Sequence, residues 1–152
     1  MKRVYGLAAV LAVAIGSSAA MALDAPAAIK DRQDFYKDIG KSMKGLGEEL
    51  KSSSPNAAEL KKFAAAIDAS APRIPALFPA GTGPEAGVKT GAKAEIWQKP
   101  DEFKKDAADM AAAAHALNMA AQTDDAGAVK DAIGKLGETC KACHQTSREK
   151  EH

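Results

Sequence analysis

The feature that most constrains the fold is a row of core-type positions that leads into two cysteines near the C-terminus. Val129, Ile133, Leu136, Cys140 and Cys143 alternate in steps of four and three residues. This spacing places all of them on one face of an α-helix. We therefore predict a helix packed in a bundle, and we expect any group held by the cysteines to lie inside the bundle rather than on its surface.

The cysteines belong to the pentapeptide Cys140-Lys141-Ala142-Cys143-His144. Two thiols and an imidazole at this spacing are the attachment signature of a c-type haem. Each sulfur can add to one vinyl group of the porphyrin, and the histidine can ligate the iron. The motif thus predicts one covalent haem c on Cys140 and Cys143, with His144 as an axial iron ligand.

Three other uses of a Cys-x-x-Cys pair compete with haem attachment. A thioredoxin-like redox pair usually follows a strand, and the sequence has no β-α-β pattern. A structural zinc site needs four ligands, and the remaining histidines, His115 and His152, have no paired spacing. A simple disulfide is compatible with an oxidising compartment. The adjacent His144, in a chain with only 2 cysteines, favours haem.

A positive start, a short apolar core and an Ala-Met-Ala cleavage pattern predict a cleavable export signal over residues 1–22. The apolar run is well short of the ~20 residues that a transmembrane helix needs. We expect cleavage after Ala22, with cleavage after Ala20 as the alternative. The mature domain is then residues 23–152. Because bacteria attach haem c outside the cytoplasm, the expected location is the periplasm.

The charge of the chain excludes some partners. The 21 Lys and Arg nearly balance the 20 Asp and Glu, whereas nucleic acid binding requires a strongly basic face. The near-neutral chain also lacks a broad field that would steer a redox partner. Beyond the export signal, no apolar stretch is long enough to span a membrane. We therefore expect no nucleic acid partner and no membrane span in the mature chain.

Four segments of the mature domain have helical periodicity, and strand signals are almost absent. The first is expected from near residue 24 to near residue 51, the second from a cap at Ser54 to Pro72, the third from around Pro100, and the fourth from a cap near Thr123 or Asp124. Together they predict an all-α fold, an antiparallel four-helix bundle with haem in its core.

The long connection over residues 72–91 is rich in Pro and Gly, and we expect it to be a crossover that wraps the bundle. A short helical piece around residues 95–98 is expected to hold Trp97 against the core. On the first helix, Arg32 is a charged residue among apolar seam positions. A buried charge needs a partner, and a haem propionate would serve.

These features together resemble the class II c-type cytochromes, the group of cytochrome c′ and cytochrome c556. The resemblance covers nearly the whole mature chain. It rests on the haem motif at the C-terminal end, Arg32-Gln33, Leu77-Phe78-Pro79, Glu95-Ile96-Trp97 and Arg148.

The resemblance implies roles for the matched positions. It implies thioether bonds at the two cysteines and His144 as the proximal ligand. Arg32 and Gln33 would lie near the haem edge and propionates, and Glu85 would approach the same edge. Arg148 would cover the proximal side, although it is equally suited to be a cation favourably placed in a last helical turn.

The resemblance leaves two residues for the distal side of the iron. Alignment on Arg32 and Gln33 places Tyr36 there, and a bulky neutral tyrosine favours the five-coordinate iron of cytochrome c′. Met43, two turns or about 10 Å further along the helix axis, is the alternative sixth ligand of the c556 type. A methionine ligand generally raises the haem potential and suits electron transfer.

The expected function is therefore electron transfer by a five-coordinate haem c protein that also binds nitric oxide or carbon monoxide. The alternatives are a low-spin c556-type carrier, or a nitric oxide binding or scavenging protein that is not a redox carrier. We do not expect an enzyme, because a peroxidase would need distal acid–base groups that the first helix does not offer. Expected partners are periplasmic redox proteins and, since family members are often homodimers, a second copy of the chain.

Overall fold

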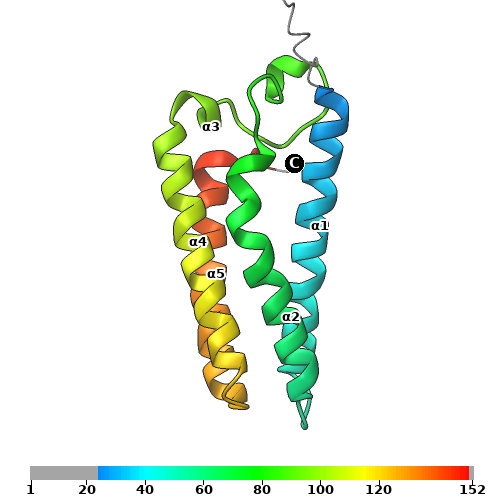
Figure 1. The fold of residues 1–152 in the computed structure, drawn as a ribbon, viewed down its shortest axis with the longest axis vertical. Coiled ribbons are helices and arrows are strands. Elements are labelled where there is room, and N and C mark those ends of the chain that lie inside the picture. The colour runs from blue at the N-terminus through cyan, green and yellow to red at the C-terminus, as the bar shows by residue number, and fades with distance from the viewer. Residues whose placement is uncertain (1–23, 151–152) are drawn as a thin grey trace, which may run out of the picture.

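The computed structural model describes residues 24–150, so the expected export signal and His152 lie outside the described residues. Four long helices form an antiparallel bundle (Figure 1): α1 (Ala25–Glu49), α2 (Ala57–Ser70), α4 (Pro100–Ala121) and α5 (Ala126–Ser147). The predicted all-α four-helix bundle is confirmed. Within the described range there is no strand, only one isolated antiparallel bridge between Ala92 and Arg148.

Two of the four helices begin where the sequence places them. The side chain of Asp24 caps α1 by accepting a hydrogen bond from the Ala27 amide, and Pro26 lies in the first turn. Helix α4 begins at Pro100, whose missing N–H costs nothing at the start of a helix.

The predicted cap of α2 is wrong by two residues, and the cap of α5 lies next to the predicted positions. Asn56, not Ser54, caps α2, and its Oδ1 accepts hydrogen bonds from the amides of Ala58 and Glu59 at 2.9 and 3.3 Å. Asp125 caps α5 in the same way. In both cases more than one Ser, Thr, Asp or Asn residue near the start of the helix is a competent cap, and the turn geometry decides which one is used.

The end of α2 also differs from the prediction. The α-helix ends at Ser70 and continues directly as the 3₁₀ helix η1 (Ala71–Leu77), which contains Pro72 and Pro75. Proline ends the α-helix because it lacks an N–H, but the tighter 3₁₀ turn starting at Ala71 accommodates it. A second 3₁₀ turn, η2 (Pro84–Ala86), follows, and the predicted short helix is present as α3 (Glu95–Gln98).

The connection between α2 and α4 lies across one end of the bundle, where α1 begins and α5 ends (Figure 1). It does not wrap the bundle as expected, because α2 and α4 are themselves neighbours that pack against each other. The connection thus covers the end of the molecule that holds the cysteine motif.

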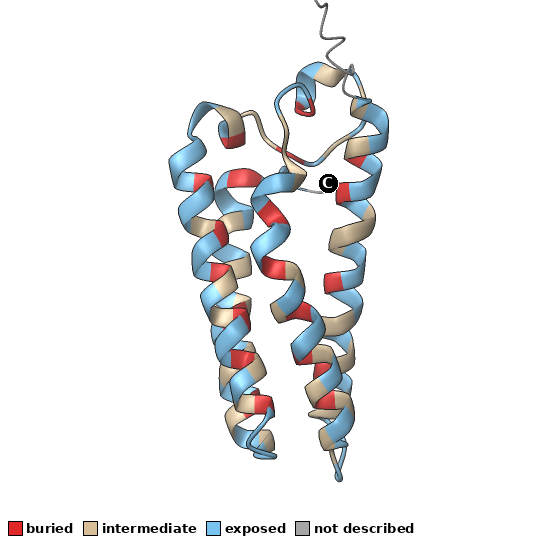
Figure 2. Ribbon diagram, in the orientation of Figure 1, coloured by how far each residue is buried: buried red, intermediate tan, exposed pale blue. Residues whose placement is uncertain are grey.

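The core follows the predicted seams, with buried residues on the inner faces of the helices (Figure 2). Its largest fully buried side chains include Leu46 of α1, Ile67 of α2, Leu117 of α4 and Leu136 of α5. The closely packed pairs are α1 with α2, α2 with α4, and α4 with α5. Among the described helices, α1 and α5 are not such a pair. None of the helices in the described range is long and apolar enough to cross a bilayer.

Candidate functional site

The site begins on the last turns of α5. Cys140 and Cys143 are free thiols, half-buried and packed against the apolar core. Burial raises the pKa of both thiols. Partial burial lowers the pKa of His144, and the positive charge of Arg148 adds to this. A neutral imidazole next to two free thiols is a donor set for a covalently attached, iron-containing group.

Tyr36, on α1, lies close enough to both thiols for their charges to affect its pKa. Its ring meets Phe35 and Phe78 edge-on, with centroids 5.6 and 6.4 Å away. Burial raises the pKa of Tyr36 well above its usual value, and the negative charge that Cys143 or Cys140 would carry as a thiolate raises it further. The phenol is therefore neutral at physiological pH. The structure thus brings Tyr36 and both cysteines together from opposite ends of the chain.

The hydroxyl of Tyr36 has no hydrogen-bond partner within the described part of the chain. Every fully buried side-chain nitrogen or oxygen there does have one. The hydroxyl oxygen therefore lies where a further group can reach it.

Met43, the rival distal residue, is half-buried and packs against the same core from α1. Met110 is a buried core residue of α4, as its seam position predicts. His115 is exposed, and its Nδ1 lies 3.3 Å from Oδ2 of Asp68 on α2. It therefore belongs to the surface where α2 meets α4, not to the cysteine site.

Arg32 is buried, with only 3% of its surface exposed. Its Nη1 donates to Oγ1 of Thr82 at 3.1 Å and to the carbonyl of Leu77 at 3.4 Å. Its Nη2 donates to the carbonyl of Thr82 and to Oγ1 of Thr90, both at 2.9 Å. The guanidinium also lies over the Phe78 ring, 4.5 Å from the centroid. The partner that a buried charge requires is thus protein, and a haem propionate is not needed to satisfy it.

Thr82 and Thr90 were missed by the sequence analysis. Thr82 has 0% of its surface exposed and also donates from Oγ1 to the carbonyl of Pro79 at 2.8 Å. A threonine flanked by glycines, as in Gly81-Thr82-Gly83, resembles any other polar turn residue. No sequence signal links it to an arginine 50 residues earlier.

Gln33 and Glu85, the other residues predicted to lie near the haem edge, also make hydrogen bonds to backbone groups of the connection. Nε2 of Gln33 donates to the carbonyl of Lys89 at 3.1 Å. Glu85 is exposed, and its Oε1 accepts from the amide of Gly83 at 3.1 Å. Their expected approach to a haem edge stays a prediction.

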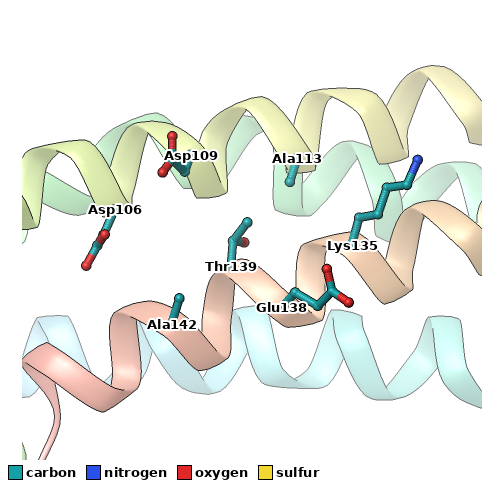
Figure 3. A pocket seen from close by; sticks show the side chains of 7 residues that line it. All are labelled: Asp106, Asp109, Ala113, Lys135, Glu138, Thr139 and Ala142. Atoms are coloured by element: carbon teal, nitrogen blue, oxygen red, sulfur yellow. The ribbon is translucent and has the colours of Figure 1, made fainter.

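A separate surface pocket of about 360 Å³ lies between α4 and α5 (Figure 3). It is lined by Asp106, Asp109, Ala113, Lys135, Glu138, Thr139 and Ala142. It contains neither cysteine nor histidine. Among the described residues, no cluster of three or more His, Cys, Asp or Glu is placed to hold a metal ion. The cysteine end of the bundle is therefore the candidate site.

A family profile described as cytochrome c′ matches residues 27–148 of the chain. The chain belongs to the cytochrome c′ family. Members of this family carry one covalently attached haem c, so the chain is a haem protein. A cytochrome c′ from Pararhodospirillum photometricum is 45% identical over 122 residues, which cover 80% of this chain and 95% of the relative. A cytochrome c-556 from Agrobacterium fabrum is 36% identical, covering 90% of this chain and 91% of the relative.

Solved structures of cytochrome c′ have the same fold. One, at 1.8 Å resolution, is described as showing ligand-controlled dimer dissociation. It superposes with a TM-score of 0.79 at 35% identity and covers 84% of this chain and 98% of its own. A nitric oxide complex of a cytochrome c′ variant from Alcaligenes xylosoxidans superposes with a TM-score of 0.74 at 26% identity, covering 83% of this chain and 97% of its own.

The residues of the site fit the haem of a cytochrome c′. The two thiols are unpaired and face inward, three residues apart on one helix. On α1, Tyr36 and Met43 pack against the same core and are only half-buried. Helices α1 and α5 are not a closely packed pair, which is compatible with a flat apolar group between them.

Proposed function

We propose that this cytochrome c′ is a periplasmic electron-transfer protein whose haem iron is five-coordinate and binds nitric oxide or carbon monoxide. Cys140 and Cys143 carry the haem, His144 is the axial ligand, and Tyr36 shields the opposite face. The bound haem supplies one-electron chemistry and an iron site for a diatomic gas. The observation that supports this best is that Tyr36, a neutral phenol, packs against the same core as both cysteines and lies within reach of their charges. The nitric oxide complex of the relative supports gas binding.

The protein contributes position and shielding in this proposal. The raised pKa of Tyr36 keeps the side chain a phenol, and a phenol is a poor iron ligand. Its aromatic contacts with Phe35 and Phe78 hold the ring on the inner side of α1. The lowered pKa of His144 keeps its imidazole neutral, as an axial ligand must be.

The second candidate is a low-spin carrier of the c556 type with Met43 as the sixth ligand. The half-buried position of Met43 on the inner side of α1 and the relative named cytochrome c-556 favour it. Against it, Met43 lies about 10 Å further along the helix axis than Tyr36. Tyr36 also makes edge-on aromatic contacts with Phe35 and Phe78, which hold its ring in place.

The deciding experiment is the optical spectrum of the purified holoprotein, ferric and ferrous, with and without carbon monoxide. A high-spin spectrum that shifts on adding the gas is expected. A low-spin spectrum that ignores the gas, and that Met43→Ala converts to high-spin, would establish the second candidate instead. Rapid, saturable turnover of hydrogen peroxide would contradict the proposal that the protein is a carrier and not an enzyme.

Two further expectations accompany the proposal. Export predicts that the protein is recovered from the periplasm with Leu23 as its first residue, which mass spectrometry of the mature chain tests.

Self-association as a homodimer stays a prediction from the resemblance. Sedimentation with and without carbon monoxide tests it, and also tests whether a gas dissociates the dimer, as a ligand does in the solved relative.

A further inference from the structure

The distance between Tyr36 and the cysteines decides how much room a gas finds at the iron. Helices α1 and α5, which carry these residues, do not pack closely against each other. Each packs on a different neighbour, α1 on α2 and α5 on α4. At the cysteine end of the bundle, another element must therefore hold α1 and α5 at a defined distance.

The connection over residues 82–93, which we call the strap, is bonded to α1 through Arg32. Oγ1 of Thr90 accepts from Arg32 Nη2 at 2.9 Å, and the carbonyl of Thr82 accepts from the same nitrogen. Because an arginine fork has donors in fixed directions, it can hold two such segments in one geometry. The bonds are buried or half-buried, so water competes poorly for them.

The other side of the strap is bonded to the end of α5. The amide of Lys93 donates to the carbonyl of Ser147 at 3.0 Å, and the amide of Glu149 donates to the carbonyl of Gly91 at 2.8 Å. These two bonds flank the antiparallel bridge between Ala92 and Arg148. The end of α5 that follows the haem motif is thus tied to the strap by backbone pairing.

Thr90 joins the two halves. Its Oγ1 accepts from Arg32 on one side and from the amide of Ala92 on the other, at 3.2 Å. A continuous path therefore runs from α1 through Arg32, Thr90 and Ala92 to Arg148 at the end of α5. The hydroxyl of Thr90 is the single group that accepts hydrogen bonds from both sides of this path.

We propose that Arg32 and Thr90 are positioning residues that set the width of the gap between α1 and α5, and thereby the rate at which a diatomic gas reaches the haem iron. The proposal rests on the proposed function, since gas binding is its readout. Loss of the Thr90 hydroxyl removes both hydrogen bonds that it accepts, and the one from Arg32 is the bond that ties this part of the strap to α1. The net loss of that bond raises the population of an open strap by about two- to tenfold.

The test compares Thr90→Val with a matched control, Thr123→Val, in the ferrous holoprotein. Thr123 makes a similar local bond, accepting from the amide of Asp125 at 3.4 Å, but it lies near the end of α4 and touches neither the strap nor Arg32. Carbon monoxide association, measured by flash photolysis, is expected to be about two- to tenfold faster in Thr90→Val and unchanged in Thr123→Val.

Arg32→Met distinguishes the strap from direct action of Arg32 on the haem. If Arg32 acts through the strap, the double variant Arg32→Met/Thr90→Val binds carbon monoxide no faster than Arg32→Met alone. The reason is that Arg32→Met already removes the hydrogen bonds from Arg32 to the strap. An association rate that changes in Arg32→Met but not in Thr90→Val would overturn the proposal and assign Arg32 to the haem propionates. Wild-type rates in both variants would overturn it as well.

Amide hydrogen exchange of the holoprotein makes failure of this proposal distinguishable from failure of the proposed function. Faster exchange at the amides of Lys93 and Glu149 in Thr90→Val, without change in Thr123→Val, is expected whether or not the iron binds a gas. A wild type that binds no carbon monoxide contradicts the proposed function. Unchanged exchange at these two amides contradicts the strap itself.

Discussion

Tyr36 combines two properties that a distal residue can use. Its aromatic ring fills space on the inner side of α1, and its hydroxyl has no hydrogen-bond partner in the described part of the chain. The hydroxyl oxygen is not fully buried, so a further group can reach it. The ring and the hydroxyl are separable by mutation, so their contributions to gas entry can be measured one at a time.

Two substitutions at this position separate bulk from polarity. If the ring is the barrier, Tyr36→Phe keeps the carbon monoxide association rate of the wild type. Tyr36→Ala raises it by roughly tenfold or more, the factor given by about 1.4 kcal/mol of lost steric barrier. Flash photolysis of the ferrous holoprotein measures both. Equal rates in Tyr36→Ala and the wild type would show that Tyr36 does not lie over the iron.

At the scale of single helices, the capping residues and the contacts between helices determine where each helix begins and how closely it packs. The loop between α1 and α2 offers Ser54 and Asn56 as caps, and the structure selects Asn56. The backbone amide of Asn56 is also bonded to Oε2 of Glu49 at the end of α1, at 3.0 Å. This bond fixes the loop so that the Asn56 side chain turns towards α2.

The choice of cap gives a prediction with an internal control. Asn56→Ala leaves two amides of α2 without their acceptor, so we expect it to lower the free energy of unfolding by about 1 kcal/mol. Ser54→Ala, at the position favoured by sequence alone, is expected to change it by less than about 0.5 kcal/mol. Urea unfolding of the holoproteins measures both, and a larger loss in Ser54→Ala would contradict the structure.

Two glycines of α1 differ in what surrounds them. A Cβ on Gly45 would lie 2.5 Å from the Phe63 ring of α2, whereas a Cβ on Gly47 would meet nothing within 4 Å. The absence of a side chain at Gly45 therefore lets α1 and α2 approach each other closely at this point.

This difference predicts opposite behaviour for the same mutation. Gly47→Ala is expected to stabilise the protein by about 0.5–1 kcal/mol, because alanine loses less backbone entropy in a helix. Gly45→Ala is expected to be less stable than Gly47→Ala by about 1–3 kcal/mol, because Phe63 must move. Thermal unfolding of the two variants, monitored by circular dichroism, compares them, and equal stability would disprove a tight contact at Gly45.

At the scale of the whole molecule, three sides of the bundle are closed by direct helix packing, and the side between α1 and α5 is not. The half-buried side chains packed against the core are apolar or aromatic on α1 and include both thiols on α5. We expect the haem of the holoprotein to cover them. The cofactor would then be part of the core, and the folded state would depend on it.

Removal of the haem tests this dependence. A Cys140→Ala/Cys143→Ala variant cannot form thioether bonds, and we expect the haem-free chain to lose more than about 3 kcal/mol of stability, the scale of one large buried side chain. Differential scanning calorimetry of haem-free and holo chains measures the loss. A haem-free chain that melts at the holoprotein temperature would show that α1 and α5 close the bundle on their own.

The sequence by itself determined the features that arise within a single helix. Apolar residues three and four apart lie on one face whatever the surroundings, so the four seams, the inward-facing cysteines and the adjacent histidine follow from spacing alone. The motif also names the cofactor, since its chemistry requires two thiols at that distance. Arg32 was identified for the same reason, as a charge on an apolar seam.

Only the tertiary structure determined which residues contact the side chains on those helix faces. The partners of Arg32 lie 45 to 58 residues away in a connection without periodicity, and the selection between Ser54 and Asn56 depends on Glu49. The position of Tyr36 near the cysteines depends on how α1 and α5 are held apart. Such contacts join segments whose approach is set by turns and loop closure, and neither leaves a repeating pattern in the sequence.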